Sequence, residues 1–146
     1  MKSRLMFTTL TIVGILGALI VPQTSAQPHV AECKVDDLTL CLQDGRFKVV
    51  FHRVQEGVAR TRGQVSMKDE ASGDVWLSKS AQPELSVRIS DQCEADAGFA
   101  VVIEPKMPVA YEATITDTVT GAQVHYASDG ESTRKVTDVP FVACRR

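Results

Sequence analysis

Residues 38–51 read LTLCLQDGRFKVVF, and this stretch decides the fold class. Apolar side chains occupy alternate positions in both of its halves, at Leu38, Leu40, Leu42, Phe47, Val49 and Phe51. A period of two is typical of a β-strand with one buried face. Asp44-Gly45, which separates the two runs, is typical of a hairpin turn. The stretch therefore predicts two antiparallel strands.

The same alternation continues through most of the chain. Further strands are expected at 85–91, 99–105, 111–116, 123–126 and 135–144. Pro140 restricts the last of these to a sheet edge or a bulge. Residues 54–74 are the least patterned, and we expect one weak strand flanked by loops there. The whole pattern predicts an all-β fold, an antiparallel β-sandwich that is immunoglobulin-like or similar and stapled by disulfides, with a small barrel as the alternative.

The first 26 residues have the pattern of a secretory signal peptide. Lys2 and Arg4 precede an apolar run at 5–21, and Thr24-Ser25-Ala26 is a small-residue cleavage site. An uncleaved membrane anchor is the alternative, but the run lies at the lower length limit of a spanning helix, and Pro22 directly follows it. We therefore expect residues 1–26 to be removed on export.

The expected mature chain, residues 27–146, forms a single β-sandwich domain. It holds 120 of the 146 residues, with 14 basic and 18 acidic side chains, so its net charge is −4. This sign excludes a polybasic nucleic-acid binder. The chain contains no second long apolar run, which excludes a multi-span membrane protein. We expect a secreted or periplasmic protein with no membrane span after cleavage.

The cysteines are interpreted in the light of export. In an oxidising compartment, Cys33, Cys41, Cys93 and Cys144 predict two disulfides. Zinc sites favour closely spaced pairs, and no such pair is present here. Four cysteines permit three pairings. We prefer Cys33–Cys144 with Cys41–Cys93, which would clamp both chain ends, and the local Cys33–Cys41 pair is the close alternative.

Candidate catalytic residues are few and carry no motif. His29, His52 and His125 are the histidines, and no serine lies in a G-x-S-x-G sequence. His52 and His125 fall on the polar phase of their strands, where a solvated histidine is the ordinary outcome. We predict no catalytic residue, and a hydrolase with a site assembled in space around His52 or His125 is the alternative.

Metal and cofactor sites are not expected either. Gln27-Pro28-His29 resembles an amino-terminal copper site. In such a site the backbone amide of the second residue loses its proton and binds the metal through nitrogen, and Pro28 has no amide N–H. The loop 129–132, Asp-Gly-Glu-Ser, lacks the oxygen-rich ladder of a calcium loop. We therefore predict no metal ligand and no cofactor.

Two side chains are candidate partner contacts. Trp76 has apolar residues on both sides, and a core position is favoured over an exposed anchor for a partner. Lys106 lies in the segment Glu104-Pro105-Lys106-Met107-Pro108, where two prolines stiffen a loop of the kind that protease inhibitors present. A protease inhibitor is therefore a further alternative function.

Several sequence blocks occur in a fixed order between residues 33 and 144. They are Cys33, Leu40-Cys41-Leu42, Gly45-Arg46-Phe47-x-Val49, Leu85-x-Val87-x-Ile89-x-Asp91-x-Cys93 and Thr114-x-Thr116-Asp117-Thr118-Val119-Thr120-Gly121-Ala122, with a downstream Tyr126. In this order they resemble a family of small exported bacterial β domains to which no activity is assigned. The resemblance implies a compact exported sandwich and transfers no catalytic residues.

The chain departs from that family at two places. Val75-Trp76-Leu77-Ser78 stands where the family tends to carry an aromatic run, and Asp96-Ala97-Gly98 stands where it tends to have an Asn-Gly turn before an aromatic strand. An aromatic binding face, if relatives have one, is therefore reduced here. The function expected from the sequence is a non-enzymatic binding or structural module whose partner is a protein or the cell-envelope surface.

Overall fold

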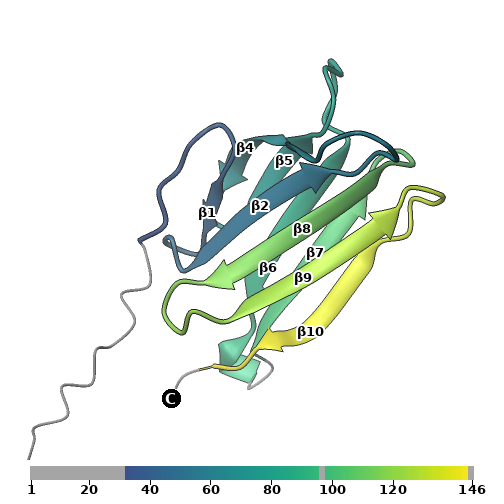
Figure 1. The fold of residues 1–146 in the computed structure, drawn as a ribbon. Coiled ribbons are helices and arrows are strands. Elements are labelled where there is room, and N and C mark those ends of the chain that lie inside the picture. Colours follow the sequence, from purple (N-terminus) through teal and green to yellow (C-terminus); the bar gives the residue numbers. More distant parts are fainter. Residues whose placement is uncertain (1–31, 96–97, 145–146) are drawn as a thin grey trace, which may run out of the picture.

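A computed structural model describes residues 32–95 and 98–144. The predicted signal peptide and Gln27-Pro28-His29 lie outside the described residues. Two antiparallel sheets pack face to face (Figure 1), so the predicted β-sandwich is confirmed. The first sheet contains, in spatial order, β1 (Leu40–Leu42), β2 (Phe47–Arg53), β8 (Ala110–Asp117) and β9 (Gln123–Asp129), with β3 (Thr61–Arg62) beside β2.

The second sheet is built mainly from the middle and the end of the chain. It contains, in spatial order, β10 (Val136–Val142), β7 (Phe99–Pro105), β6 (Leu85–Asp91), β5 (Ser72–Trp76) and β4 (Gln64–Asp69). One short 3₁₀ turn, η1 (Cys93–Ala95), follows β6. The predicted edge position of the segment with Pro140 is confirmed, because β10 pairs only with β7 and its register shifts between Asp138 and Val142.

The core lies between the sheets and is formed by the alternating apolar positions. Phe47 of the first sheet packs edge-on against Phe99 of the second, with ring centroids 4.9 Å apart. Full burial of each such side chain contributes about 1.5–3 kcal/mol to stability. Further fully buried members of this cluster are Leu40, Leu42, Val49, Phe51, Val75, Leu85, Val87, Ile89, Val101, Ile103, Tyr111, Ala113 and Ile115.

The hairpin predicted from residues 38–51 is confirmed. β1 and β2 pair antiparallel, with Leu42 opposite Phe47. The turn between them has positive φ at Gln43, Asp44 and Gly45, and the value of +79° at Gly45 is one that glycine adopts at no steric cost. Leu40 and Leu42 of β1 and Phe47 of β2 are all fully buried, so the hairpin supplies one end of the core.

The expectation of a single weak strand in residues 54–74 is wrong. The segment contains β3, the whole of β4 and the start of β5. Along β4 only Val65 is buried, and the other five residues are exposed. An edge strand with a single inward apolar side chain has no period-two pattern to detect, which is why the sequence gave no signal.

The preferred disulfide pairing is also wrong, and the alternative is correct. Cys33 is bonded to Cys41, and Cys93 is bonded to Cys144. Cys41 lies in the first sheet opposite Lys48, whereas Cys93 follows β6 of the second sheet, so the core separates these two cysteines. The two predicted disulfides are therefore confirmed, but each one joins two segments that belong to the same sheet or directly adjoin it.

The topology explains the pairing of Cys93 with Cys144. β6 and β10 flank β7 on its two sides, and Phe99 at the start of β7 is opposite both Asp91 and Val142. The chain reaches Cys93 just after Asp91 and Cys144 just after Val142. The disulfide therefore bridges two strand ends that the sheet already brings to the same corner of the second sheet (Figure 1).

The two sheets are linked in different ways along the two lateral sides of the sandwich. On the β1–β4 side, main-chain hydrogen bonds join the sheets, from Val65 N to Asp37 O (2.8 Å) and from Gln43 N to Glu70 O (2.7 Å). On the β9–β10 side, the Tyr126 hydroxyl donates to Asp138 Oδ2 (2.8 Å). No residue of β9 or β10 is fully buried. Figure 1 shows β9 and β10 next to each other at this margin of the molecule.

Candidate functional site

The edge strand β9 is the longest regular sheet edge among the described residues. Its residues pair with β8 in seven consecutive positions, from Thr116↔Gln123 to Ala110↔Asp129, with no register shift. Its other side has no neighbouring strand among the residues that the structure describes. An edge of this kind presents a row of unpaired N–H and C=O groups and is a template for another strand.

The other edge strands are short or irregular. β1 has three residues and β3 has two. β4 shifts register between Met67 and Asp69, and its Val65 N–H is already bonded to Asp37. β10 shifts register as well and contains Pro140, which has no N–H to donate. Features of this kind protect an edge from pairing, and β9 has none of them.

The direction of the main-chain groups along β9 follows from the ladder. Ala110 O accepts from Val54 N (3.2 Å) on the β2 side of β8, whereas Asp117 N donates to Ala122 O (2.9 Å) on the β9 side. Bonding direction alternates along a strand, so odd-numbered residues of β8 bond to even-numbered residues of β9. The residues that point their main-chain groups away from β8 are the odd-numbered ones, Gln123, His125, Ala127 and Asp129. We call these outward groups the β9 edge.

The outer face of the first sheet next to the β9 edge is polar. His125 Nδ1 lies 3.1 Å from Thr114 Oγ1, and Gln123 Nε2 donates to Thr116 Oγ1 (3.3 Å). His125 and Ala127 are exposed. These cross-strand contacts fix the side chains on β9 while leaving its main-chain edge open, so the edge is presented in a defined conformation.

The two described histidines of the hydrolase alternative are not brought together. His52 lies on β2 opposite Glu112, and His125 lies on β9 opposite Thr114. The strand β8 separates them, which places them about 10 Å or more apart at the ordinary strand spacing. Glu112, which lies beside His52, forms an ion pair with Arg60 (2.8 Å).

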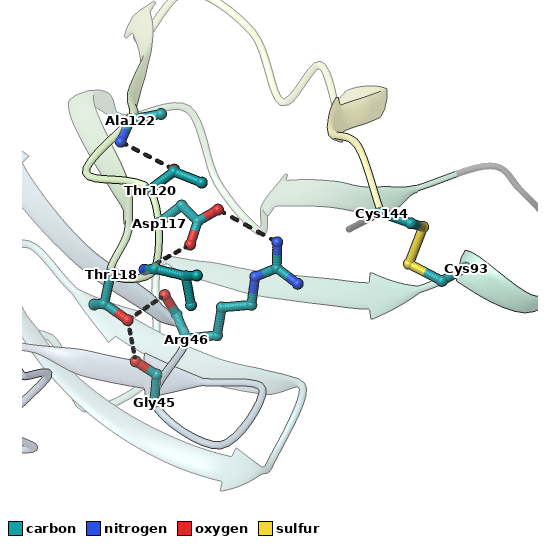
Figure 2. Close-up of polar contacts among 9 residues, drawn as sticks. Gly45, Arg46, Cys93, Asp117, Thr118, Thr120, Ala122 and Cys144 are labelled. Carbon is teal, nitrogen blue, oxygen red and sulfur yellow. Dashed lines mark hydrogen bonds and ion pairs between the residues drawn. A yellow bond between two sulfur atoms is a disulfide. The ribbon is translucent and has the colours of Figure 1, made fainter. Parts of the chain in front are cut away.

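An ion pair between the partly buried Arg46 and the buried Asp117 holds the turn that leads into β9 (Figure 2). Arg46 Nη2 lies 3.3 Å from Asp117 Oδ2, and Asp117 Oδ1 accepts from Val119 N (2.9 Å). Burial alone would raise the pKa of Asp117, but the bonds from Val119 and Arg46 outweigh it and hold the pKa below its ordinary value of 3.8. The guanidinium also lies over the ring of Phe99, 4.3 Å from its centroid.

Thr118 joins the same turn to the β1–β2 hairpin. Its hydroxyl lies within hydrogen-bond distance of Arg46 O (2.9 Å) and Gly45 O (3.1 Å), and its N–H donates to Arg46 O (2.8 Å). Figure 2 shows these contacts beside the Cys93–Cys144 disulfide. Ala122 N donates to Thr120 Oγ1 (3.2 Å) within the turn. Much of the sequence block 114–122 therefore has a structural role, which is to anchor the start of β9.

Trp76 lies outside the hydrophobic core, so the favoured core position is wrong. It is half-buried at the end of β5, opposite Gln64 of the edge strand β4. Gln64 and Trp76 share the outer face of the second sheet, whereas the neighbouring Val75 points inward and is fully buried. A role of Trp76 as a partner contact stays a prediction.

Lys106 is held against the second sheet. Its Nζ lies 3.1 Å from Asp74 Oδ1, and its N–H donates to Glu84 O (2.8 Å). Asp74 also pairs with Lys68 (3.6 Å), so the lysine is part of a small network of charges on the outer face. Within the predicted stiff loop, Glu104 and Pro105 belong to β7. The inhibitor function and a partner contact at Lys106 stay predictions.

Other classes of site can be compared with the described residues. Within 32–95 and 98–144, no three His, Cys, Asp or Glu side chains gather closely enough to hold a metal ion. In loop 129–132, Asp129 Oδ1 accepts from Glu131 N (3.0 Å), so one carboxylate oxygen is used in the local turn. In the same parts of the chain, no helix has both the length and the apolar character needed to cross a membrane.

Comparisons with protein-family models, with curated proteins and with solved structures found no match to this chain. The resemblance to a family of exported bacterial domains therefore stays a prediction. The two intramolecular disulfides indicate an oxidising environment outside the cytoplasm. The β9 edge is a feature that sequence patterns did not identify, because alternation reveals a strand but not whether the strand has neighbours on both sides.

Proposed function

We propose that this chain is a secreted or periplasmic, non-enzymatic binding module that takes an extended segment of a protein partner onto the β9 edge. The observation that carries the proposal is the row of outward main-chain groups on a regular seven-residue edge strand. An extended peptide adds to such an edge through main-chain hydrogen bonds. Two disulfides and the export pattern of residues 1–26 support the location.

The side chains of β9 give the added segment a specific register. Gln123 and His125 stand on the outer face, and Val124 and Tyr126 point toward the core and are partly buried. An added strand would place its own alternate side chains beside these two rows. Main-chain bonds then supply affinity, and the side chains of β9 supply discrimination between sequences.

The anchoring of β9 supports the same function. Asp117, Arg46 and Thr118 fix the turn before it, and the Tyr126–Asp138 bond fixes its middle. A template strand that is already ordered does not lose further conformational entropy when a partner binds. The partner alone orders on binding, which is the situation that favours measurable affinity for a short segment.

The experiment uses a photo-crosslinking residue in place of Ala127 of the exported chain. After capture from envelope or host extracts, the crosslinked peptide is sequenced, and the partner is purified. Its affinity is then measured for the wild type, for Ala127→Pro and for Ala127→Thr. Proline removes the outward N–H at 127 and is tolerated on an edge, whereas threonine keeps the N–H and suits a strand.

The proposal expects Ala127→Thr to bind as the wild type does and Ala127→Pro to bind at least about tenfold more weakly, which corresponds to about 1.4 kcal/mol. Equal binding of the proline variant would contradict it. Analytical ultracentrifugation provides a second check. A concentration-dependent dimer that Ala127→Pro abolishes would show that the edge pairs with a second copy, and this would contradict a role in binding other proteins.

A further inference from the structure

A second feature of the β9–β10 side is a buried hydroxyl without a partner. Tyr111 lies on the inward face of β8 and is 0% exposed, and its hydroxyl has no hydrogen-bond partner among the described residues. Buried hydroxyls are normally paired, so each exception calls for an explanation. Burial raises the pKa of Tyr111, which keeps the phenol neutral and able both to donate and to accept.

Tyr111 lines a recess of about 480 Å³ at the end of the sandwich where β9 leads into β10. Small-molecule sites commonly have volumes of about 300–1,000 Å³. The other residues that line this recess are Ala127, Ser128, Asp129, Glu131, Ser132, Arg134 and Val136. The lining of the β9–β10 recess thus includes a residue with a buried, unpaired hydroxyl together with charged and hydroxyl side chains.

Part of the wall of the recess is fixed against β8. Gly130 has φ +83°, and a Cβ at this position would lie 2.6 Å from Ala110 N, so only glycine fits. Gly130 N also donates to Ser128 Oγ (3.2 Å). Ser132 and Arg134 are exposed.

The charges at the mouth select the kind of ligand. Asp129 and Glu131 supply two carboxylates against the single guanidinium of Arg134, and none of the three forms an ion pair with another described residue. A surplus of negative charge favours a cation over an anion. The lining contains no exposed aromatic ring on which a sugar could stack.

We propose that the β9–β10 recess binds a small primary ammonium compound that also carries a hydroxyl group. The ammonium group lies with the carboxylates of Asp129 and Glu131, and the ligand hydroxyl pairs with the hydroxyl of Tyr111. The recess uses side chains at the end of β9, whereas partner binding uses the main-chain groups of the β9 edge. Failure of one proposal would therefore leave the other unaffected.

Three two-carbon probes test the class of ligand on the purified exported chain. Ethanolamine has the ammonium and the hydroxyl, glycolate has a carboxylate and the hydroxyl, and ethylene glycol has hydroxyls alone. Chemical shifts of the Tyr111 ring and of the amides at 128–136 are followed by NMR during titration. We expect saturable shifts with ethanolamine only. No saturable shift, or equal shifts with all three probes, would overturn the proposal.

Substitutions in the recess separate binding from folding. Tyr111→Phe removes a hydroxyl that has no partner among the described residues, so the variant is expected to fold with at least wild-type stability but to bind ethanolamine about tenfold more weakly. Glu131→Gln is expected to weaken binding by a similar factor, and Arg134→Gln, the matched control, is not. Wild-type affinity in Tyr111→Phe, or a loss in Arg134→Gln equal to that in Glu131→Gln, would refute the assignment.

Discussion

The two lateral sides of this sandwich differ in how their edge groups are used. On the β1–β4 side, the outward N–H of Val65 is bonded to Asp37 O, and Gln43 N is bonded to Glu70 O. On the β9–β10 side, no strand within 32–95 or 98–144 lies beside the outward groups of β9, and a side-chain bond from Tyr126 to Asp138 links the two edge strands. The main-chain groups on the β1–β4 side are therefore used in hydrogen bonds between the sheets, whereas those of the β9 edge are available to another strand.

This difference shows how a small sandwich can be stable and still offer an edge. The β1–β4 side lies next to the buried hairpin of Leu40, Leu42 and Phe47, so hydrogen bonds and core packing reinforce each other there. The β9–β10 side has no fully buried residue on either edge strand, and a disulfide at Cys93–Cys144 and the Arg46–Asp117 pair hold its ends instead. Local anchors thus replace burial where the edge stays open.

The largest expected effect comes from removing the disulfides one at a time. Replacing Cys93 and Cys144 by alanine opens a loop with a sequence separation of 51, and replacing Cys33 and Cys41 opens one of 8. The chain-entropy relation gives losses of about 4 and about 2.5 kcal/mol in the free energy of unfolding. Urea denaturation of the two double variants measures both values. A larger loss on removal of Cys33–Cys41 would contradict the view that the stability of the β9–β10 side depends more on its disulfide than that of the β1–β4 side does.

A matched pair of proline substitutions compares the two edges directly. Val65→Pro removes an N–H that is bonded to Asp37 O and disturbs a buried apolar side chain, so we expect a loss of about 3 kcal/mol. Ala127→Pro removes an N–H that points to solvent, and we expect a loss below about 1 kcal/mol. Chemical denaturation measures both. Equal losses would mean that β9 is paired after all.

The anchor before β9 is expected to depend on pH. The pKa of Asp117 is lowered, so its contribution is fully present above the unfolded-state value of 3.8 and is lost as the pH falls through the lower folded-state value. Asp117→Asn is therefore expected to cost about 2 kcal/mol at pH 7. As the pH falls from 3.8 through the lower folded-state value, this difference from the wild type is expected to shrink. A pH-independent difference would show that the ion pair with Arg46 does not contribute.

The smallest expected effect is at the Tyr126–Asp138 contact. Tyr126→Phe removes one hydrogen bond on the β9–β10 side and is expected to cost about 1 kcal/mol at neutral pH. Burial and then Asp138 raise the pKa of Tyr126, so its contribution is present below the ordinary value of 10.0 and is lost at higher pH. Above pH 10, the free energy of unfolding is therefore expected to fall less steeply with pH in the variant than in the wild type. Part of the pH dependence remains in the variant, because the pKa of Tyr111 is also raised. An unchanged slope would argue against the contact.

Period-two patterning predicted the parts of the fold in which one face is buried. β2, β6, β7, β8 and β9 were expected near their observed positions, and Pro140 correctly indicated an edge. β4 was missed because only Val65 points into the core. The disulfide pairing depends on which sheet each cysteine joins, and local sequence does not contain that information.

The candidate site was less accessible from sequence than the fold. Arg46 and Asp117 are 71 positions apart, so no local pattern could pair them, although each stands in a sequence block that carries the family resemblance. The strand at Val124 and Tyr126 was expected, but its free edge results from the order of the sheets. Tyr111 follows the apolar phase of β8, and nothing in the sequence marks its hydroxyl as unpaired.

Amide hydrogen exchange of residues 27–146, measured residue by residue by NMR, tests the central claim most directly. Val65 and Ala127 both direct an N–H away from their own sheet. That of Val65 is bonded to Asp37 O, and that of Ala127 has no main-chain acceptor in the described part of the chain. We predict slow exchange at Val65, fast exchange at His125 and Ala127, and slow exchange at Tyr126 between them, because Tyr126 bonds to β8. Uniform protection along β9, or fast exchange at Val65, would contradict a sandwich with one closed and one open side.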